Sequence, residues 1–317
     1  MQFRGEHCNG FVAIHSTRRG PAFGGIRFQQ YSSERDALND ALNLSKAMSL
    51  KCAVSELPSG GGKSVIIQRP GTDKTEALKE FSEVLNSLEG TYFAGPDIGI
   101  ERSDLELLSA LAPNVACEAD GHLGSIAEHT ASGVWHAIRA CLERIPVARP
   151  VLALQGMGAV GSALARIVHQ QQLRLAISDI VPDRCALASE LEAEVIDPEK
   201  ILASQCSVLA PCAMGGVITT EVARATPAGA ICGSANNLLA QDDVADVLDR
   251  RGVLFVPDFV SSAGGVIRGV EYYLLQKASS HDSIGRIYST TAAILDEAKK
   301  TKTTALQVAT SWAEARL

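Results

Sequence analysis

The chain lacks long stretches of one chemical kind. Its 317 residues carry a net charge of -7 and no run of Lys or Arg, whereas a nucleic-acid surface needs clustered cations to neutralise phosphates. No apolar run approaches the roughly 20 residues that cross a bilayer, and residues 1–20 lack the residue order of a secretory signal. We therefore expect no nucleic-acid partner, no membrane partner and a cytoplasmic location.

Paired cysteine and histidine motifs are also missing. The eight cysteines are scattered without a Cys-x-x-Cys pair, and the seven histidines show no metal-ligand spacing. Such usage is typical of a reduced compartment and of a protein without a disulfide or zinc framework. We expect no bound metal. At 46% hydrophobic and 21% charged residues, a chain of this length is expected to form two domains rather than one.

A glycine turn past the midpoint is the strongest local signal. Gly156, Gly158 and Gly161 follow an apolar segment at 151–154 and open a helical pattern. The first glycine permits a tight turn, the second lets the backbone approach a pyrophosphate, and the third allows close helix packing. The helix N-terminus supplies N–H donors for phosphates. The pattern alone is weak, but its context predicts a dinucleotide-binding βαβ unit.

The next predicted strand, at 173–178, ends in Asp179. A carboxylate at this position accepts hydrogen bonds from ribose hydroxyls and repels a 2′-phosphate, which favours NAD over NADP. Arg184, five residues later, either reduces the preference for NAD over NADP or is a solvated residue in the first turn of a helix.

Two lysines and one aspartate form a second group of candidates. Ser33 and Asp36 form a capping box for a helix that ends near Lys51; that lysine is equally consistent with a charge complementing the helix dipole. We expect one apolar face on this helix, formed by Ala37, Leu38, Ala41, Leu42, Ser45 and Met48.

Residues 57–64, Leu-Pro-Ser-Gly-Gly-Gly-Lys-Ser, run into an apolar strand at 65–67. A phosphate loop is excluded, because Leu57 stands where that motif needs glycine and because the loop precedes a strand. We interpret the three glycines as letting a substrate lie against the backbone while Lys63 reaches its polar groups. Asp97 follows a short strand in a Gly/Pro loop, where an acid is either a turn former or part of a site. Two lysines and this aspartate fit amino-acid oxidation.

Eight segments in order carry a family resemblance. They are Gly20–Arg27, Met48–Ala53, Leu57–Lys63, Gly95–Gly99, the Gly156 turn, Ala210–Gly215, Gly233–Asn237 and Pro257–Val266. Together they resemble the glutamate/leucine/phenylalanine/valine dehydrogenase family, most closely its leucine and phenylalanine branch, over nearly the whole chain. The resemblance implies reversible, nicotinamide-dependent oxidative deamination of an L-amino acid to its 2-oxo acid and ammonia.

The resemblance also implies residue roles. Lys51 falls on the carboxylate-binding lysine, Lys63 on the catalytic lysine and Asp97 on the proton-transferring aspartate. Further substrate-binding positions are Phe23, Gly24, Gly95, Asn237, Val266 and Gly269. The cofactor-binding positions are Gly156, Met157, Gly158, Ala159, Val160, Gly161, Asp179, Ile180, Thr130, Cys212, Ala213 and Asn236.

The implied side-chain pocket predicts the kind of substrate. Where the glutamate branch holds a distal carboxylate with a lysine and a serine, this chain has Phe23 and Gly269. Burying a carboxylate without partners costs several kcal/mol, which argues against glutamate. Phe23 partly refills the space left by glycines, so we expect an apolar or aromatic amino acid. Ordinary core packing of Phe23, and a polar substrate near Arg268, remain alternatives.

The implied architecture is α/β, with two domains around a cleft. Residues 1–128 form the substrate-binding and catalytic domain, with the helices of 285–317 packing back on it, and residues 129–284 form a Rossmann-type NAD-binding domain. We expect a homodimer or a higher homo-oligomer. The resemblance leaves one alternative open, because Ser262 stands where most relatives carry asparagine: a catalytically inactive dinucleotide-binding homologue that acts as a binding or regulatory subunit.

Overall fold

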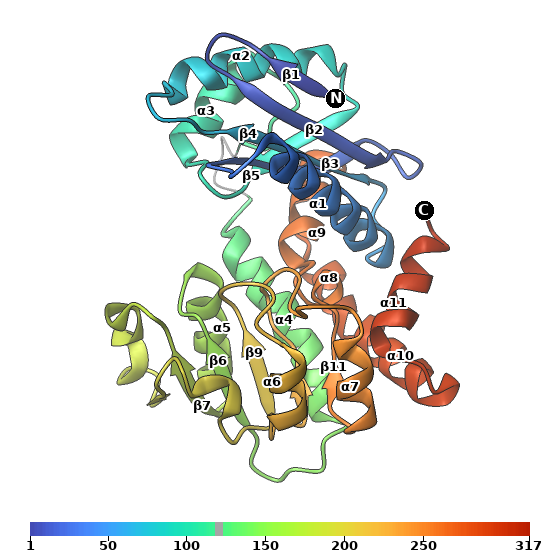
Figure 1. The fold of residues 1–317 in the computed structure, drawn as a ribbon. Helices are drawn as coiled ribbons and strands as arrows, with labels where there is room; N and C mark the ends of the chain where they lie inside the picture. The colour runs from blue at the N-terminus through green and yellow to red at the C-terminus, as the bar shows by residue number, and fades with distance from the viewer. Residues whose placement is uncertain (118–122) are drawn as a thin grey trace. The chain divides into compact units, whose positions relative to one another are not determined.

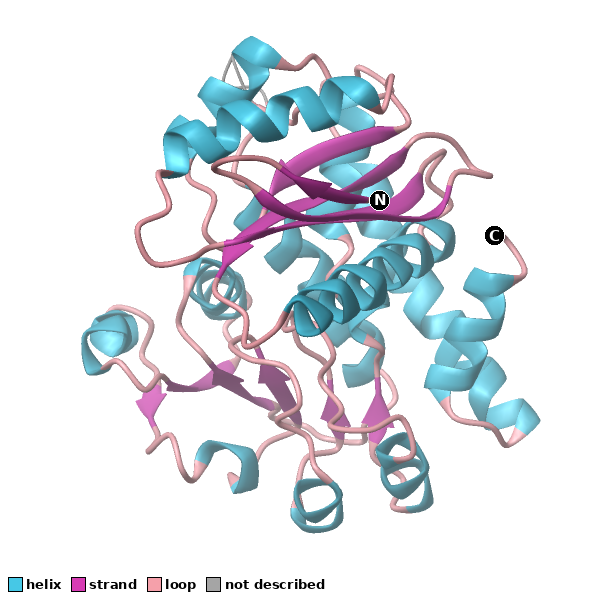
Figure 2. Ribbon diagram, turned by 45° about the horizontal axis from the view of Figure 1, so that its top comes forward, coloured by secondary structure: helices cyan, strands magenta, loops and turns pink. Residues whose placement is uncertain are grey.

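The computed structural model describes residues 1–117 and 123–317, which divide into two compact units. The first unit comprises Met1–Leu123, Gly269–Lys277 and Ala313–Leu317, and the second comprises Gly124–Arg268 and Ala278–Trp312. Each unit pairs one sheet with helices, as the strands and helices of Figures 1 and 2 show. The chain is therefore an α/β protein of two parts.

The first unit contains a five-stranded mixed sheet in the order β1-β2-β4-β3-β5. Strand β3 lies between β4 and β5 and is parallel to both, whereas β2 is antiparallel to β1 and β4. The elements are β1 (Gln2–Arg4), β2 (Asn9–Ser16), β3 (Ala22–Gln29), α1 (Glu34–Val54), β4 (Gly60–Ile67), α2 (Lys74–Ser87), β5 (Tyr92–Pro96) and α3 (Arg102–Leu111).

The two faces of this sheet pack against different helices. Ile66 of β4 belongs to a core with Leu78 and Phe81 of α2. Val65, on the opposite face, joins a smaller core with Ala37 of α1. Because side chains alternate along a strand, Lys63 lies on the same face as Val65. The candidate lysine therefore belongs to the face that α1 covers in part.

The three glycines expected to carry substrate lie inside strand β4 instead. A Cβ at Gly62 would come within 2.7 Å of the Tyr92 ring, and one at Gly61 would meet the backbone of α1 at Ser49. The space beside these glycines is thus filled by the protein itself. Our interpretation was wrong on this point: the glycines let a helix and an aromatic ring approach the strand closely.

Helix α1 begins as predicted but buries a different face. Ser33 caps it and accepts a hydrogen bond from the Asp36 amide at 3.1 Å. Ala37 and Ala41 are buried, whereas Leu38 and Leu42, which we expected on the same face, are 36% and 50% exposed. The closest approach of α1 to β4 is at Gly61, where Ser45 and Ser49 face the strand, while Leu44 and Leu50 of the same helix are buried.

The second unit contains a six-stranded parallel sheet in the order β11-β10-β9-β6-β7-β8. The first strand of this unit, β6, lies in the middle of the sheet; β7 and β8 follow on one side, and β9, β10 and β11 on the other. This is the doubly wound Rossmann order, and its topological switch point lies between β6 and β9. Its strands are β6 (Val151–Gln155), β7 (Arg174–Ser178), β8 (Glu194–Val195), β9 (Val208–Pro211), β10 (Ala230–Ile231) and β11 (Leu254–Phe255).

Helices and short 3-10 segments precede, connect and follow these strands. They are α4 (Ile126–Leu142), α5 (Ala159–Gln170), η1 (Pro182–Ala188), η2 (Ile201–Ala203), α6 (Thr220–Ala225), α7 (Val244–Arg250), α8 (Asp258–Ser261), α9 (Gly264–Tyr273), α10 (His281–Thr301) and α11 (Ala305–Glu314). Helix α10 packs on α4 within the second unit. Of residues 285–317, which we expected with the first domain, only Ala313–Leu317 are grouped with the first unit. In the described parts of the chain, no helix combines the length and apolarity needed to span a bilayer.

The close approach of α1 to β4 leads to a stability prediction. Gly61→Ala should lower the free energy of unfolding by about 1–3 kcal/mol, because the new methyl group forces α1 away from the sheet. Gly285→Ala, in α10 with the nearest atom 4.0 Å from the new Cβ, is the control and should be neutral or stabilising. Urea unfolding measures both; equal effects of the two substitutions would contradict the packing argument.

Candidate active site

Lys63 and Asp97 form an ion pair within the first unit. Lys63 comes from β4, and Asp97 follows directly after β5. The Lys63 ammonium donates a hydrogen bond to Asp97 Oδ2, and the two side chains are only 7% and 22% exposed. The structure thus brings together the two residues for which the resemblance implies catalytic roles.

Gly25 of β3 provides the space in which this pair meets. A Cβ at Gly25 would lie 2.7 Å from the Cβ of Asp97 and 3.0 Å from Nζ of Lys63. Strand β3 separates β4 from β5, so the two side chains reach each other across it. A residue without a side chain at this position therefore permits the contact.

Three further residues, which the sequence did not single out, extend the pair. Arg27 donates from Nε to Asp97 Oδ2 at 3.0 Å, and its Nη1 donates to Asp40 at 3.0 and 3.2 Å. The Tyr31 hydroxyl donates to Asp40 at 2.6 Å. Arg27 lies two residues after Gly25, so both are on the same face of β3. This two-residue spacing is the feature of the sequence from which the position of Arg27 beside the pair could have been predicted.

Burial and neighbouring charges shift the ionisation of these groups. Burial lowers the pKa of Lys63 and outweighs the opposing attraction of Asp97, while the Arg27 charge lowers it further. Burial alone would raise the pKa of Asp97, but the charges of Lys63 and Arg27 lower it below its usual range. A buried lysine of lowered pKa beside an ionised carboxylate is a group suited to proton transfer.

Lys51 lies in the last turn of α1, the helix that packs on β4. It is buried, with an exposed fraction of 7%. Solvated lysines at helix ends are normally exposed, so a role limited to complementing the helix dipole does not account for its burial.

Phe23 dominates the expected side-chain pocket. Its ring stacks on Phe93, with centroids 5.9 Å apart and an interplanar angle of 8°. A Cβ at Gly269 would lie 3.1 Å from this ring, whereas one at Gly95 would find its nearest neighbour, Ala116, at 3.7 Å. A Cβ at Gly95 would thus be in ordinary contact with Ala116, the Gly24 carbonyl and the Phe23 ring. Gly24 lies against the backbone of Gly62 in β4.

In the second unit, the glycine turn stands at the switch point of the sheet. Gly156 follows β6 with a φ of +97°, and a Cβ there would lie 2.6 Å from Ala213 in the loop after β9. Gly161 packs against the carbonyl of Gly156, while no atom lies within 4 Å of a Cβ built at Gly158. Open space thus remains beside Gly158, at the N-terminus of α5, where first-turn amides have no acceptor within the helix.

Asp179 reaches back from the end of β7 to this turn. Its carboxylate accepts from the amides of Met157 at 2.7 Å and Val181 at 2.9 Å. Burial raises its pKa, but these amides and Arg184, 3.7 Å away, lower it overall. The acid is therefore ionised beside the glycine turn.

The remaining cofactor and substrate candidates of the second unit lie in several segments. Ala159 and Val160 begin α5, Ile180 is 83% exposed after β7, and Cys212 follows β9. The Thr130 hydroxyl donates to the Ile126 carbonyl within α4, at 2.8 Å. Asn236 and Asn237 follow β10, and the Asn237 amide donates to Asp258 at 3.1 Å. Val266 lies in α9.

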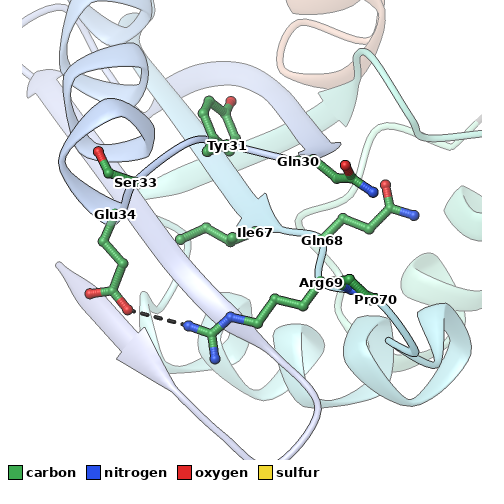
Figure 3. A pocket seen from close by; sticks show the side chains of 8 residues that line it. All are labelled: Gln30, Tyr31, Ser33, Glu34, Ile67, Gln68, Arg69 and Pro70. Atoms are coloured by element: carbon green, nitrogen blue, oxygen red, sulfur yellow. Dashed lines mark hydrogen bonds and ion pairs between the residues drawn. The ribbon is translucent and has the colours of Figure 1, made fainter.

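A surface hollow of about 280 Å³ opens elsewhere on the first unit (Figure 3). It is lined by Gln30, Tyr31, Ser33, Glu34, Ile67, Gln68, Arg69 and Pro70. None of the predicted site residues lines it. Within residues 1–117 and 123–317, no group of three or more His, Cys, Asp or Glu side chains is arranged to hold a metal ion.

A Rossmann unit with an acid at its glycine turn, joined to a unit with a buried Lys–Asp pair, defines a class of two-domain dinucleotide-dependent dehydrogenase. The chain belongs to the glutamate/leucine/phenylalanine/valine dehydrogenase family. Residues 2–110 match the family's dimerisation domain and residues 183–308 its second domain. This confirms the resemblance found in the sequence.

Individual relatives carry more specific names. The chain is 33% identical to the L-tryptophan dehydrogenase of Nostoc punctiforme, over 96% of this chain and 88% of that protein. It is 33% identical to the leucine dehydrogenase of Geobacillus stearothermophilus, over 96% and 86% of the two chains. The crystal structure of the Nostoc punctiforme tryptophan dehydrogenase superposes with a TM-score of 0.84 at 31% identity, covering 100% of this chain and 94% of that one.

The ion pair predicts a pH-dependent contribution to stability. Because the folded pKa of Asp97 lies below its ordinary value of 3.8, the stabilisation is present above pH 3.8 and disappears as the pH falls through the folded pKa. Asp97→Asn should lower the free energy of unfolding by about 1–3 kcal/mol at pH 7, because it leaves Lys63 buried without its counter-charge.

Chemical unfolding of wild type and Asp97→Asn between pH 7 and pH 3 measures this difference. Glu106→Gln, which removes half of the exposed Arg102–Glu106 pair, is the control and should change stability by less than about 0.5 kcal/mol. A difference that stays constant to pH 3 would show that the charge of Asp97 does not stabilise the fold.

Proposed function

We propose that the protein catalyses the NAD-dependent, reversible oxidative deamination of an apolar or aromatic L-amino acid to its 2-oxo acid and ammonia. The observation that carries the proposal is the buried Lys63–Asp97 pair, in a chain that belongs to this dehydrogenase family. The relatives are named as dehydrogenases, so the alternative of an inactive binding subunit has no support among them.

In this proposal Lys51 fixes the substrate carboxylate. A cation held on a rigid helix orients the amino acid so that its Cα hydrogen faces the acceptor, and this restriction supplies much of the rate enhancement of a two-substrate reaction. The buried position of Lys51 in α1 supports this role.

Lys63 and Asp97 carry the proton transfers. Once the Cα hydrogen has left as hydride, the substrate is an iminium, and water must add to its carbon before ammonia departs. The neutral amine of Lys63, whose formation the lowered pKa favours, takes a proton from that water, and the resulting ammonium polarises the developing carbonyl oxygen. Asp97, within hydrogen-bond reach of Lys63, moves protons to and from the substrate nitrogen.

The residues of the second unit fit a dinucleotide. The open space beside Gly158 and the amides at the start of α5 suit a pyrophosphate, and Asp179 suits the adenosine ribose. Although two amides already occupy Asp179, a carboxylate has about four lone-pair sites. NAD, when bound, accepts the hydride. We assign the cofactor role to the second unit and the substrate role to the first.

The proposed substrate class rests on the surroundings of Phe23. The stacked Phe23–Phe93 pair and the neighbouring Tyr273, whose ring centroid lies 5.8 Å from that of Phe93, present aromatic surface. An apolar or aromatic side chain is stabilised by such a surface, whereas a carboxylate would lose its hydration without a partner.

We further propose that the protein self-associates as a homodimer or larger homo-oligomer. The first unit matches a family domain described as a dimerisation domain, and Leu38 and Leu42 of α1 are exposed on it. The proposed cytoplasmic location rests on the eight free cysteines, which suit a reduced compartment. The mass in solution, measured by light scattering, tests the assembly.

The catalytic role of Lys63 leads to the central prediction. With NAD and a panel of L-amino acids, absorbance of the reduced nicotinamide should rise with apolar or aromatic members of the panel. Lys63→Ala should reduce kcat by about 10²–10⁴-fold, because it removes the group that activates water. Lys79→Ala, which removes an exposed lysine paired with Glu76, should leave kcat unchanged. Silence of the wild type in both reaction directions, with NAD still bound, would refute the proposed reaction.

The carboxylate of Asp179 leads to a prediction on cofactor choice. Asp179→Ser should lower kcat/KM for NAD about 10-fold or more and raise that for NADP, because it removes a charged acceptor and its repulsion of the 2′-phosphate. Asp183→Ser, at an exposed acid of the following 3-10 segment, is the matched control. Steady-state kinetics with both cofactors decide; an unchanged ratio of the two would exclude Asp179 from ribose recognition.

A further inference from the structure

We propose that Arg27 is a positioning residue of the active site. Asp40 and Tyr31 hold Arg27 in place, and Arg27 in turn keeps the Asp97 carboxylate within hydrogen-bond reach of Lys63. The inference rests on the proposed function, since it assigns Arg27 a part in the same reaction. Nothing in the sequence motifs required it: Arg27, Asp40 and Tyr31 come together only in the folded first unit.

The first step of the argument is the shared oxygen. Arg27 Nε and Lys63 Nζ both donate to Oδ2 of Asp97, from strands β3 and β4. Asp97 itself lies just beyond the end of β5, where fewer backbone contacts restrain it than within the sheet. Two donors from two strands therefore fix the direction of its carboxylate through Oδ2, and in the proposed reaction the other oxygen, Oδ1, serves the substrate nitrogen.

The second step is the anchoring of Arg27. Its Nη1 donates to both oxygens of Asp40, on α1, and the Tyr31 hydroxyl donates to Oδ2 of Asp40. A guanidinium held at two edges cannot rotate away from Asp97 without breaking several charged hydrogen bonds. Tyr31 also lines the surface hollow of Figure 3. The series of hydrogen-bonded side chains therefore extends from the surface to the buried lysine.

The third step is the charge balance. Two cations and two anions alternate in the order Lys63, Asp97, Arg27 and Asp40, and the four side chains are between 7% and 25% exposed. Besides Tyr31, the titratable Tyr92 of β5 lies near them, and its hydroxyl donates to the carbonyl of Gly24. Removing one member leaves a neighbour with an uncompensated, poorly hydrated charge. The ionisation of the catalytic pair therefore depends on Arg27 and Asp40.

The two outer residues act on Lys63 with opposite sign. The Arg27 charge lowers the pKa of Lys63 and of Asp97, whereas the Asp40 charge raises the pKa of Lys63. Arg27→Gln should therefore raise the pKa of Lys63 and shift the pH profile of kcat to higher pH. Asp40→Asn should lower the pKa of Lys63. A residue that merely stabilises the fold would not produce shifts of opposite direction.

The test compares five proteins: wild type, Arg27→Gln, Arg27→Lys, Asp40→Asn and Arg69→Gln. Arg69→Gln is the matched control, because it removes an arginine whose 3.4 Å ion pair with Glu34 is exposed at the edge of the same unit. Steady-state kinetics give kcat and KM across pH. Competitive amine acetylation, followed by mass spectrometry over a pH series, gives the titration midpoint of Lys63 without requiring turnover.

We expect Arg27→Gln to lower kcat about 10–100-fold with a much smaller change in KM, because a misplaced proton-transfer group affects the reaction more than substrate binding. The Lys63 midpoint should rise in Arg27→Gln, fall in Asp40→Asn and remain unchanged in Arg69→Gln. Arg27→Lys keeps the charge without the planar fork, so its midpoint should lie nearer the wild type while kcat stays reduced.

Unchanged Lys63 midpoints in Arg27→Gln and Asp40→Asn, or shifts of both in one direction, would overturn the proposal. If Arg27→Gln does not fold, as judged by thermal melting, the midpoints of Arg27→Lys and Asp40→Asn decide. If the wild type turns over no amino acid, the proposed function fails, and the midpoints still show whether Arg27 controls the Lys63–Asp97 pair.

Discussion

The contact between Lys63 and Asp97 is the constraint on which the first unit depends. A lysine ammonium buried to this extent loses most of its hydration, so a carboxylate must lie beside it. The two residues come from strands on either side of β3, and only a glycine at position 25 leaves room between them. The sheet order and the glycine at position 25 together therefore allow the ion pair to form.

The second unit depends on backbone geometry rather than on buried charge. Its strand order places the loops after β6 and β9 side by side, where Gly156 and Ala213 meet. Asp179 then ties the end of β7 to the same turn through the Met157 amide. One carboxylate thus has two uses: it fixes the conformation of the glycine turn, and it offers its remaining lone pairs to a ribose.

A feature can be predicted from the sequence when the residues that form it lie close together along the chain. The glycine turn, the Ser33 cap and the strand-end position of Asp97 are local patterns, and each is found where predicted. The Arg27–Asp40 contact is tertiary and leaves no local pattern. Helical spacing placed Leu38 on the buried face of α1, but periodicity alone does not report how closely a helix approaches its sheet.

That close approach links the packing of the fold to the electrostatics of the site. Ala37 and Ala41 are buried on α1, and the same helix meets β4 through Ser45 and Ser49, where Gly61 has no side chain. Asp40, one residue before Ala41, is thereby carried to within 3.0 Å of Arg27. A side chain at Gly61 would move the helix outward and Asp40 with it. The small residues of α1 and β4 thus keep Asp40 within reach of the charged groups that surround Lys63.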